Sequence, residues 1–120
     1  MLGVAKAFDL LKPDEILYPG KQGCPITSTR VSDQEWLRVA GENDWIVFTR
    51  DKHIRSRPQE RNAMLEAGVR VFCLTGKEDY SKWDQAKIIM KNWDSIELIA
   101  EQPGPYIYSV TSGGGLRQVA

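Results

Sequence analysis

The chain has 120 residues, the length of one domain, and its 42% hydrophobic and 27% charged residues are the usual balance of a globular protein. Sixteen basic and sixteen acidic side chains give zero net charge, which excludes a global attraction to nucleic acid or membrane. No apolar run approaches the roughly 18 residues that span a bilayer, and the first residues lack the core of a secretory signal. Two unclustered cysteines are typical of a reducing compartment, so we expect a cytoplasmic protein.

The predicted secondary structure alternates between helices and strands. Apolar residues at helical spacing indicate the helices, β-branched and aromatic runs indicate the strands, and glycine, proline and polar clusters indicate the connections. In chain order, we predict a helix over 4–11, a strand over 15–18, a loop over 21–30, a helix over 33–40, a strand over 45–49, a helix over 58–67, a strand over 69–74, a helix over 81–93, a short helix over 96–100 and a strand over 106–111.

Local patterns support these boundaries. Ser32 followed by Glu35 is a capping box, in which the serine hydroxyl accepts a hydrogen bond from the amide of residue 35. Trp45 to Thr49 is an unbroken run of β-branched and aromatic residues, typical of a strand that is covered on both faces. All four tryptophans fall at positions predicted to face inward, so we interpret them as core residues rather than platforms for stacked bases. They are Trp36, Trp45, Trp83 and Trp93. In the helix over 81–93, the expected inward residues also include Ala86, Ile89 and Met90.

This order predicts an α/β fold of three layers, with helices on both faces of a mostly parallel sheet. Residues 1–112 are predicted to form a single domain, and the glycines at 113–115 predict a flexible tail over 113–120. Such sheets bind ligands at the carboxyl ends of their strands. The chain opens on a helix, whereas this architecture usually opens on a central strand, so one position in the sheet is expected to be unfilled.

Four carboxylates are expected at the carboxyl edge of the sheet. Asp51 follows the strand over 45–49, Asp33 begins a helix, and Asp79 and Asp84 flank the start of the helix over 81–93. Hard oxygen ligands grouped in this way suit Mg²⁺ or Mn²⁺. The helix dipole also favours aspartate at a helix start. Capping therefore explains Asp33 as well as metal binding does, and it is the preferred interpretation of Asp79 and Asp84. Asp51, directly after a buried strand, has less structural reason to be an aspartate, so a functional role is favoured for it.

Basic side chains gather around the end of the same strand. They are Arg50, Lys52, His53, Arg55, Arg57 and Arg61. Because this segment leaves the same edge, a phosphate-contact patch is slightly favoured over a solvated loop balanced by Glu60 and Glu66. His53 is able to contact phosphate or transfer a proton, but it is more often a plain polar loop residue. A lone histidine cannot form a zinc site, and neither a catalytic Ser-His-Asp order nor a phosphate-binding glycine loop is present.

Three segments together resemble the PIN-like domains of the VapC type. They are Ser32-Asp33-Gln34-Glu35-Trp36-Leu37, Trp45-Ile46-Val47-Phe48-Thr49-Arg50-Asp51 and Ile54-Arg55-Ser56-Arg57-Pro58-Gln59-Glu60. The similarity continues through 67–72, the helix with Trp83 and Trp93, and 105–110, and so covers nearly the whole chain.

The resemblance implies a three-layer PIN-like fold and a metal-dependent ribonuclease, often the toxin of a toxin–antitoxin pair. It implies that Asp33 and Asp51 are catalytic metal ligands of Mg²⁺ or Mn²⁺, with Asp84 as a further candidate. The RNA-binding residues would be Arg50, Lys52, His53, Arg55 and Arg57. An antitoxin protein is the expected partner, and a homodimer is also considered.

The family usually begins with a strand carrying an acidic residue, and this chain begins with the following helix, in which Asp9 does not occupy the missing position. Either the gene start is truncated or the protein is a degenerate member. We therefore expect weak Mg²⁺ binding and poor RNA cleavage unless a partner supplies the carboxylate. The alternative to an endoribonuclease toxin is a catalytically incomplete module that binds an antitoxin or another protein. A nucleotide-binding α/β domain is a third, weaker hypothesis.

Overall fold

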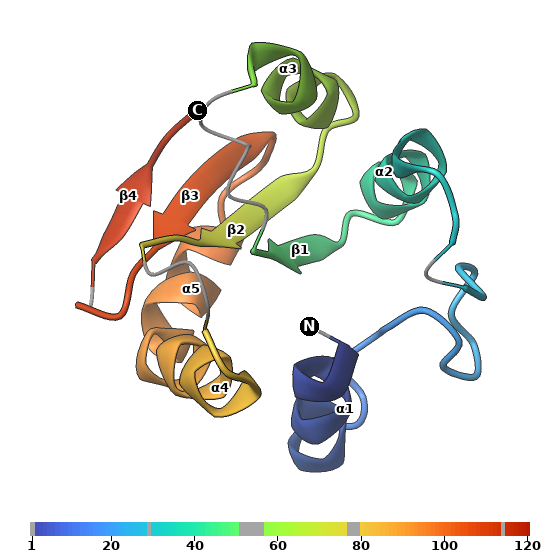
Figure 1. The fold of residues 1–120 in the computed structure, drawn as a ribbon. Coiled ribbons are helices and arrows are strands. Elements are labelled where there is room, and N and C mark those ends of the chain that lie inside the picture. Colours follow the sequence, from blue (N-terminus) through green and yellow to red (C-terminus); the bar gives the residue numbers. More distant parts are fainter. Residues whose placement is uncertain (1, 29, 51–56, 77–79, 114) are drawn as a thin grey trace.

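A computed structural model describes residues 2–28, 30–50, 57–76, 80–113 and 115–120, with the backbone alone for Leu2 and Asp33 (Figure 1). The elements in chain order are α1 Leu2–Leu11, α2 Asp33–Glu42, β1 Ile46–Thr49, α3 Pro58–Glu66, β2 Arg70–Leu74, α4 Lys82–Lys91, α5 Trp93–Ala100, β3 Tyr106–Val110 and β4 Leu116–Gln118. Within these ranges, no helix is long and apolar enough to cross a membrane.

The strands form one sheet in the order β1-β2-β3-β4. β1 pairs in parallel with β2, and β2 pairs in parallel with β3, so Phe48, Phe72 and Tyr108 lie in one row across the sheet. β4 is antiparallel to β3. The mostly parallel α/β sheet predicted from the alternating pattern is confirmed, because parallel neighbours require the helical crossovers that the sequence supplies.

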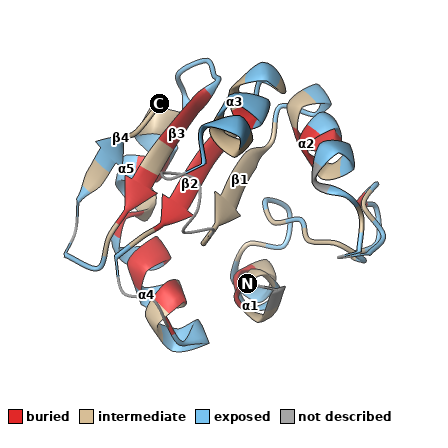
Figure 2. Cartoon of the chain, turned by 45° about the horizontal axis from the view of Figure 1, so that its top comes forward, coloured by how far each residue is buried: buried red, intermediate tan, exposed pale blue. Residues whose placement is uncertain are grey.

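Helices cover both faces of the sheet and create two cores (Figure 1). On one face, Phe72 packs with residues of α1, α4 and α5, and on the other face Ile107 packs with residues of α2 and α3. Both of these central side chains are fully buried. Figure 2 shows β2 and β3 largely buried and β1 only partly so, because β1 lies at the edge of the sheet.

The predicted strand over 15–18 is not formed. Residues 16–18 belong to no strand, and β1 pairs only with β2 in the part of the chain that the structure describes. A strand requires a hydrogen-bonded neighbour, and the next strand position beside β1 is not filled by a described segment. The run from Ile46 to Thr49, predicted to be covered on both faces, is accordingly only half-buried.

Two further predictions about packing were wrong. The flexible tail predicted over 113–120 contains β4, whose pairing with β3 runs from Leu116 to Gln118. Trp83, predicted to be inward, is 67% exposed, and Met90 is 46% exposed. The buried stripe of α4 is Gln85, Ile88 and Ile89. Trp83 lies two residues before this stripe, a rotation of about 200° around a helix with 3.6 residues per turn.

Candidate functional site

The carboxyl end of β1 is held to the start of α4 through Arg50. The Arg50 Nη1 atom donates a hydrogen bond to the Tyr80 carbonyl oxygen at 2.9 Å, and its guanidinium lies 5.7 Å from the centroid of the Tyr80 ring. Arg50 is half-buried and Tyr80 is buried. A planar guanidinium suits this combination of a directed hydrogen bond and a ring contact. The structure therefore fixes Arg50, one of the predicted RNA-binding residues, at the edge where β1 ends.

Tyr80 extends this junction to the end of β2. Its hydroxyl donates to the Thr75 carbonyl oxygen at 2.8 Å, and the Gln85 amide donates to the Tyr80 carbonyl oxygen at 3.0 Å. Gly76 has a φ of 108°, and a Cβ atom there would lie 2.9 Å from the Tyr80 hydroxyl oxygen. Sequence reasoning missed Tyr80, since its partner Arg50 is 30 residues away in the chain and no local pattern indicates the pair.

The start of α2 has the cap that the sequence predicts. Ser32 caps the helix, with its hydroxyl accepting a hydrogen bond from the Glu35 amide at 3.2 Å, as the capping box predicts. The Glu35 carboxylate instead accepts a hydrogen bond from Arg38 at 2.6 Å. This contact with Arg38 lowers the pKa of Glu35. Asp33 is the first residue of α2, and the structure describes its backbone only.

Asp84 has local contacts that explain its position. It lies in the first turn of α4, and its amide donates to the Ser81 hydroxyl at 3.0 Å. Its carboxylate lies 3.4 Å from Lys87 Nζ. The contact with Ser81 first, and Lys87 second, lowers the pKa of the Asp84 carboxyl. An aspartate in the first turn of a helix, engaged by the capping serine and a lysine, is favoured by the helix dipole, so its contacts do not point to a metal ligand.

Several predicted site residues lie outside the described part of the chain. They are Asp51, Lys52, His53, Arg55 and Asp79. Arg57 precedes α3, where its Nη1 atom lies 3.2 Å from Glu60 Oε1 and its side chain is 57% exposed. Among the described residues, no three His, Cys, Asp or Glu side chains gather closely enough to hold a metal ion. The structure therefore brings Arg50 and Tyr80 together but leaves the pairing of Asp33 with Asp51 as a prediction.

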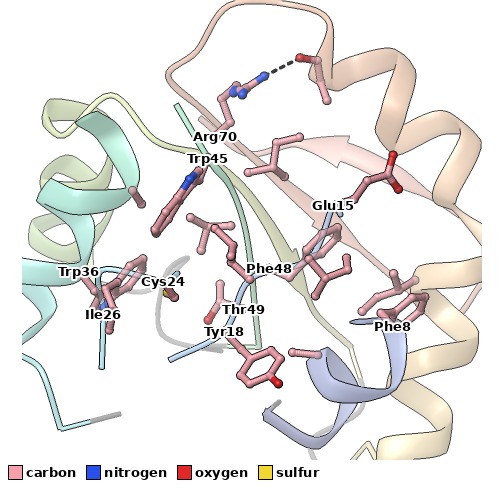
Figure 3. Close-up of a pocket in the computed structure, with 18 of the residues that line it drawn as sticks. Phe8, Glu15, Tyr18, Cys24, Ile26, Trp36, Trp45, Phe48, Thr49 and Arg70 are labelled. Atoms are coloured by element: carbon pink, nitrogen blue, oxygen red, sulfur yellow. Dashed lines mark hydrogen bonds between the residues drawn. The ribbon is translucent and has the colours of Figure 1, made fainter. Parts of the chain in front are cut away.

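A large apolar groove, here called the β1 groove, runs along β1 (Figure 3). Its volume is about 860 Å³. It is lined by residues of α1, residues 15–19, the whole of β1, Trp36 of α2 and Trp93 of α5. In Figure 3, Tyr18 and Thr49 lie toward one end, and Trp45 and Arg70 toward the other. Because Val31, Trp36 and Thr49 all line it, the groove joins the start of α2 to the carboxyl end of β1.

The sequence of this chain is similar to those of known proteins. Residues 4–76 match the family described as "PIN like domain". A protein of Mycobacterium tuberculosis (strain ATCC 25618 / H37Rv), described as "Putative ribonuclease VapC45", is 35% identical over 80 residues. That alignment covers 67% of this chain and 57% of the relative, so the chain spans little more than half the length of the curated protein it matches. No solved structure gave a significant match.

Proposed function

Because this chain belongs to the PIN-like domain family, we propose that it is a metal-dependent endoribonuclease of a toxin–antitoxin system. The observation that carries the proposal is that β1 ends in Thr49-Arg50, directly before Asp51 in the sequence, and that α2 begins at Asp33. The similarity to a mycobacterial protein described as a ribonuclease supports it. RNA is the proposed substrate, and an antitoxin protein is the proposed partner.

The proposed metal ligands are Asp33 and Asp51. Both are hard oxygen donors, which suits Mg²⁺ or Mn²⁺ by donor type. When bound, such an ion activates a water and neutralises charge on the phosphodiester. Asp84 does not fit as well, because Ser81 and Lys87 already account for its carboxylate. The proposal therefore rests on the first two aspartates.

Positioning of the RNA backbone is assigned to Arg50 and its basic neighbours. Arg50 is anchored on Tyr80 by both a hydrogen bond and a ring contact, so its charge is held at the edge rather than free to swing. Lys52, His53, Arg55 and Arg57 follow in the sequence and supply further positive charge in a chain with no net charge. Contacts of this kind bind phosphate without regard to base sequence.

The second candidate function is a catalytically incomplete PIN-like module that binds an antitoxin or another protein. The observation that favours it is that the sheet formed by the described residues ends at β1 beside a groove.

A nuclease assay separates the two functions. The chain is incubated with single-stranded RNA and either Mg²⁺ or Mn²⁺, with EDTA in a parallel reaction, and metal binding is followed by calorimetry. The enzyme predicts slow cleavage that requires the metal and stops in EDTA. Weak metal binding without cleavage would support the binding module, and cleavage that persists in EDTA would reject the metal-dependent mechanism.

A further inference from the structure

Trp83 is an aromatic side chain that the fold leaves on the surface. It is the second residue of α4 and is 67% exposed, whereas Trp36, Trp45 and Trp93 are half-buried. Trp93 stacks on two phenylalanine rings, but no ring of another described residue stacks on Trp83. Since Trp83 is not a core residue, the interpretation that remains from the sequence is a platform for a stacked base.

The start of α4 places Trp83 beside the end of β1. Arg50 follows β1 and donates a hydrogen bond to the Tyr80 carbonyl oxygen at 2.9 Å, and Trp83 follows Tyr80 by three residues. Three residues span at most about 11 Å of backbone. RNA whose phosphate lies at Arg50, as the proposed function assigns, would therefore have its adjoining nucleotides within reach of Trp83.

Lysines accompany Trp83 along one face of the helix. Trp83, Lys87, Met90 and Lys91 follow one another at spacings of three and four residues and are all exposed, and we call them the α4 face. The helix contains three lysines and one aspartate, a net charge of +2 in a chain with no net charge. Lys87 pairs with Asp84 at 3.4 Å, but both side chains are partly exposed, so this pair is weak and leaves Lys87 able to meet a phosphate.

This combination favours single-stranded RNA over a protein as the occupant of the α4 face. Lysine is depleted in protein interfaces, and Lys87 lies between the two large apolar side chains, Trp83 and Met90. Aromatic rings next to basic groups hold single strands, because bases stack on the rings while phosphates meet the positive charges. In a duplex, the neighbouring bases already cover both sides of each internal base. A platform of this kind therefore selects unpaired RNA.

We propose that the α4 face binds a single-stranded segment of the RNA substrate beside the proposed cleavage site. An unpaired base stacks on the Trp83 indole, and phosphates of the adjoining backbone contact Lys87 and Lys91, about 12 Å of helix from end to end. This site rests on the proposed function, because it takes RNA as the substrate, and it adds that the RNA is unpaired where it meets α4.

The test measures RNA binding by fluorescence anisotropy in EDTA, so that no metal-dependent cleavage occurs. The probe is a fluorescein-labelled RNA of about 16 nucleotides without self-complementarity, used alone and annealed to its complement. We expect the single strand to bind with a Kd on the order of 10 μM. Trp83→Ala should weaken this binding about tenfold, as loss of one stacked base does, and should leave duplex binding within about twofold.

Two further variants show that the ring itself is responsible. Trp83→Phe keeps an aromatic surface and should bind the single strand within about threefold of the unsubstituted chain. Leu98 of α5 is the matched control, because it is 66% exposed but lies among Asp94, Glu97 and Glu101 rather than lysines. Leu98→Ala should leave RNA binding unchanged. Circular dichroism of all the variants verifies that they are folded.

The salt dependence separates the stacked base from the phosphate contacts. Each phosphate contact contributes about 0.7 to the slope of log K against log salt concentration for a single strand. Replacing Lys87 and Lys91 together by glutamine should therefore reduce this slope by about 1.4. Trp83→Ala removes no charge and should lower the affinity without changing the slope.

Four results would overturn the proposal. They are unchanged single-strand binding by Trp83→Ala, equal losses for Trp83→Ala and Leu98→Ala, equal losses on single-stranded and duplex RNA, and a dimer in sedimentation that Trp83→Ala dissociates, which would make a second copy the occupant. Because binding is measured without metal, binding that depends on Trp83 with no cleavage in Mn²⁺ would count against the ribonuclease alone. Cleavage together with binding that does not depend on Trp83 would count against this site alone.

Discussion

Arg50 is the side chain that connects the predicted site to the rest of the fold. It carries positive charge at the end of β1 while donating to the Tyr80 carbonyl oxygen, and Tyr80 in turn donates to the Thr75 carbonyl oxygen. The ends of β1 and β2 and the start of α4 are thus linked through two side chains. The stability of the fold should therefore depend on the shape of the Arg50 side chain as well as on its charge.

Replacing Arg50 with lysine tests that role. Arg50→Lys keeps the charge but loses the planar donor and its ring contact, so we expect a loss of about 1–2 kcal/mol in the free energy of unfolding. Arg57→Lys is the matched control, because Arg57 is exposed and paired only with Glu60 in the described structure; it should change stability by less than about 0.5 kcal/mol. Urea denaturation of both variants gives the comparison, and equal losses would contradict the role assigned to Arg50.

Because Gly41 has no side chain, α2 lies close to the connection that follows α3. A Cβ atom at Gly41 would collide with the Ala67 carbonyl oxygen, whereas a Cβ atom at Gly3 of α1 would meet only the flexible end of Lys82 at 3.1 Å. We expect Gly41→Ala to lower the free energy of unfolding by about 1–3 kcal/mol, because backbone must move. Gly3→Ala should be neutral or slightly stabilising. Thermal unfolding that ranks the two variants in the opposite order would refute this packing.

At the scale of elements, the start of α4 depends on Ser81. Its hydroxyl caps the Asp84 amide and also lowers the pKa of the Asp84 carboxyl. A lowered pKa stabilises the fold above the ordinary aspartate pKa of about 3.9, and this contribution disappears as the pH falls below that value. Ser81→Ala should therefore cost about 1 kcal/mol at neutral pH and less at pH values below the pKa of Asp84.

Ser32→Ala is the control for this pH dependence. Ser32 caps α2 in the same way, but the pKa of Glu35 is lowered mainly by Arg38, which the substitution leaves in place. The stability difference caused by Ser32→Ala should stay constant with pH. Urea titrations of both variants at neutral and acidic pH provide the measurement, and parallel pH profiles would argue against the contact between Ser81 and Asp84.

The last strand gives a second prediction at this scale. β4 pairs with β3, the Val119 amide donates to the Ile107 carbonyl oxygen at 2.8 Å, and Val119 and Ala120 pack against the core under α2 and α3. Removing residues 113–120 should therefore lower Tm by at least about 5 °C, since a loss near 1 kcal/mol already shifts a domain of this size by several degrees. An unchanged Tm in calorimetry would show that this segment is the flexible tail predicted from its glycines.

Local sequence patterns predicted where helices begin better than they predicted which neighbours each element contacts. Ser32, Ser81 and Pro58 lie at helix starts because the signals for capping and for a first turn are contained in a few adjacent residues. The strand expected over 15–18 was wrong because pairing depends on a neighbour that no local pattern reveals. The contact of Arg50 with Tyr80 could not be predicted for the same reason, since it joins residues 30 positions apart.

At the scale of the whole molecule, the sheet has one closed side and one open side. β4 covers β3 at one edge, while β1 borders a groove of about 860 Å³ at the other. Thr49 both ends β1 and lines the groove, so the groove reaches the carboxyl end of β1, directly before Asp51 in the sequence.

The most direct test of the ribonuclease proposal compares two aspartates in one RNA cleavage assay with Mn²⁺. Asp51→Asn removes a proposed metal ligand and should reduce cleavage by at least about 100-fold, as loss of a group that holds a catalytic metal does. Asp84→Asn alters a first-turn carboxylate already engaged by Ser81 and Lys87 and should keep cleavage within about threefold of the unsubstituted chain, because its contacts are local to α4. Undiminished cleavage by Asp51→Asn, or no metal-dependent cleavage by the unsubstituted chain, would contradict the proposed function.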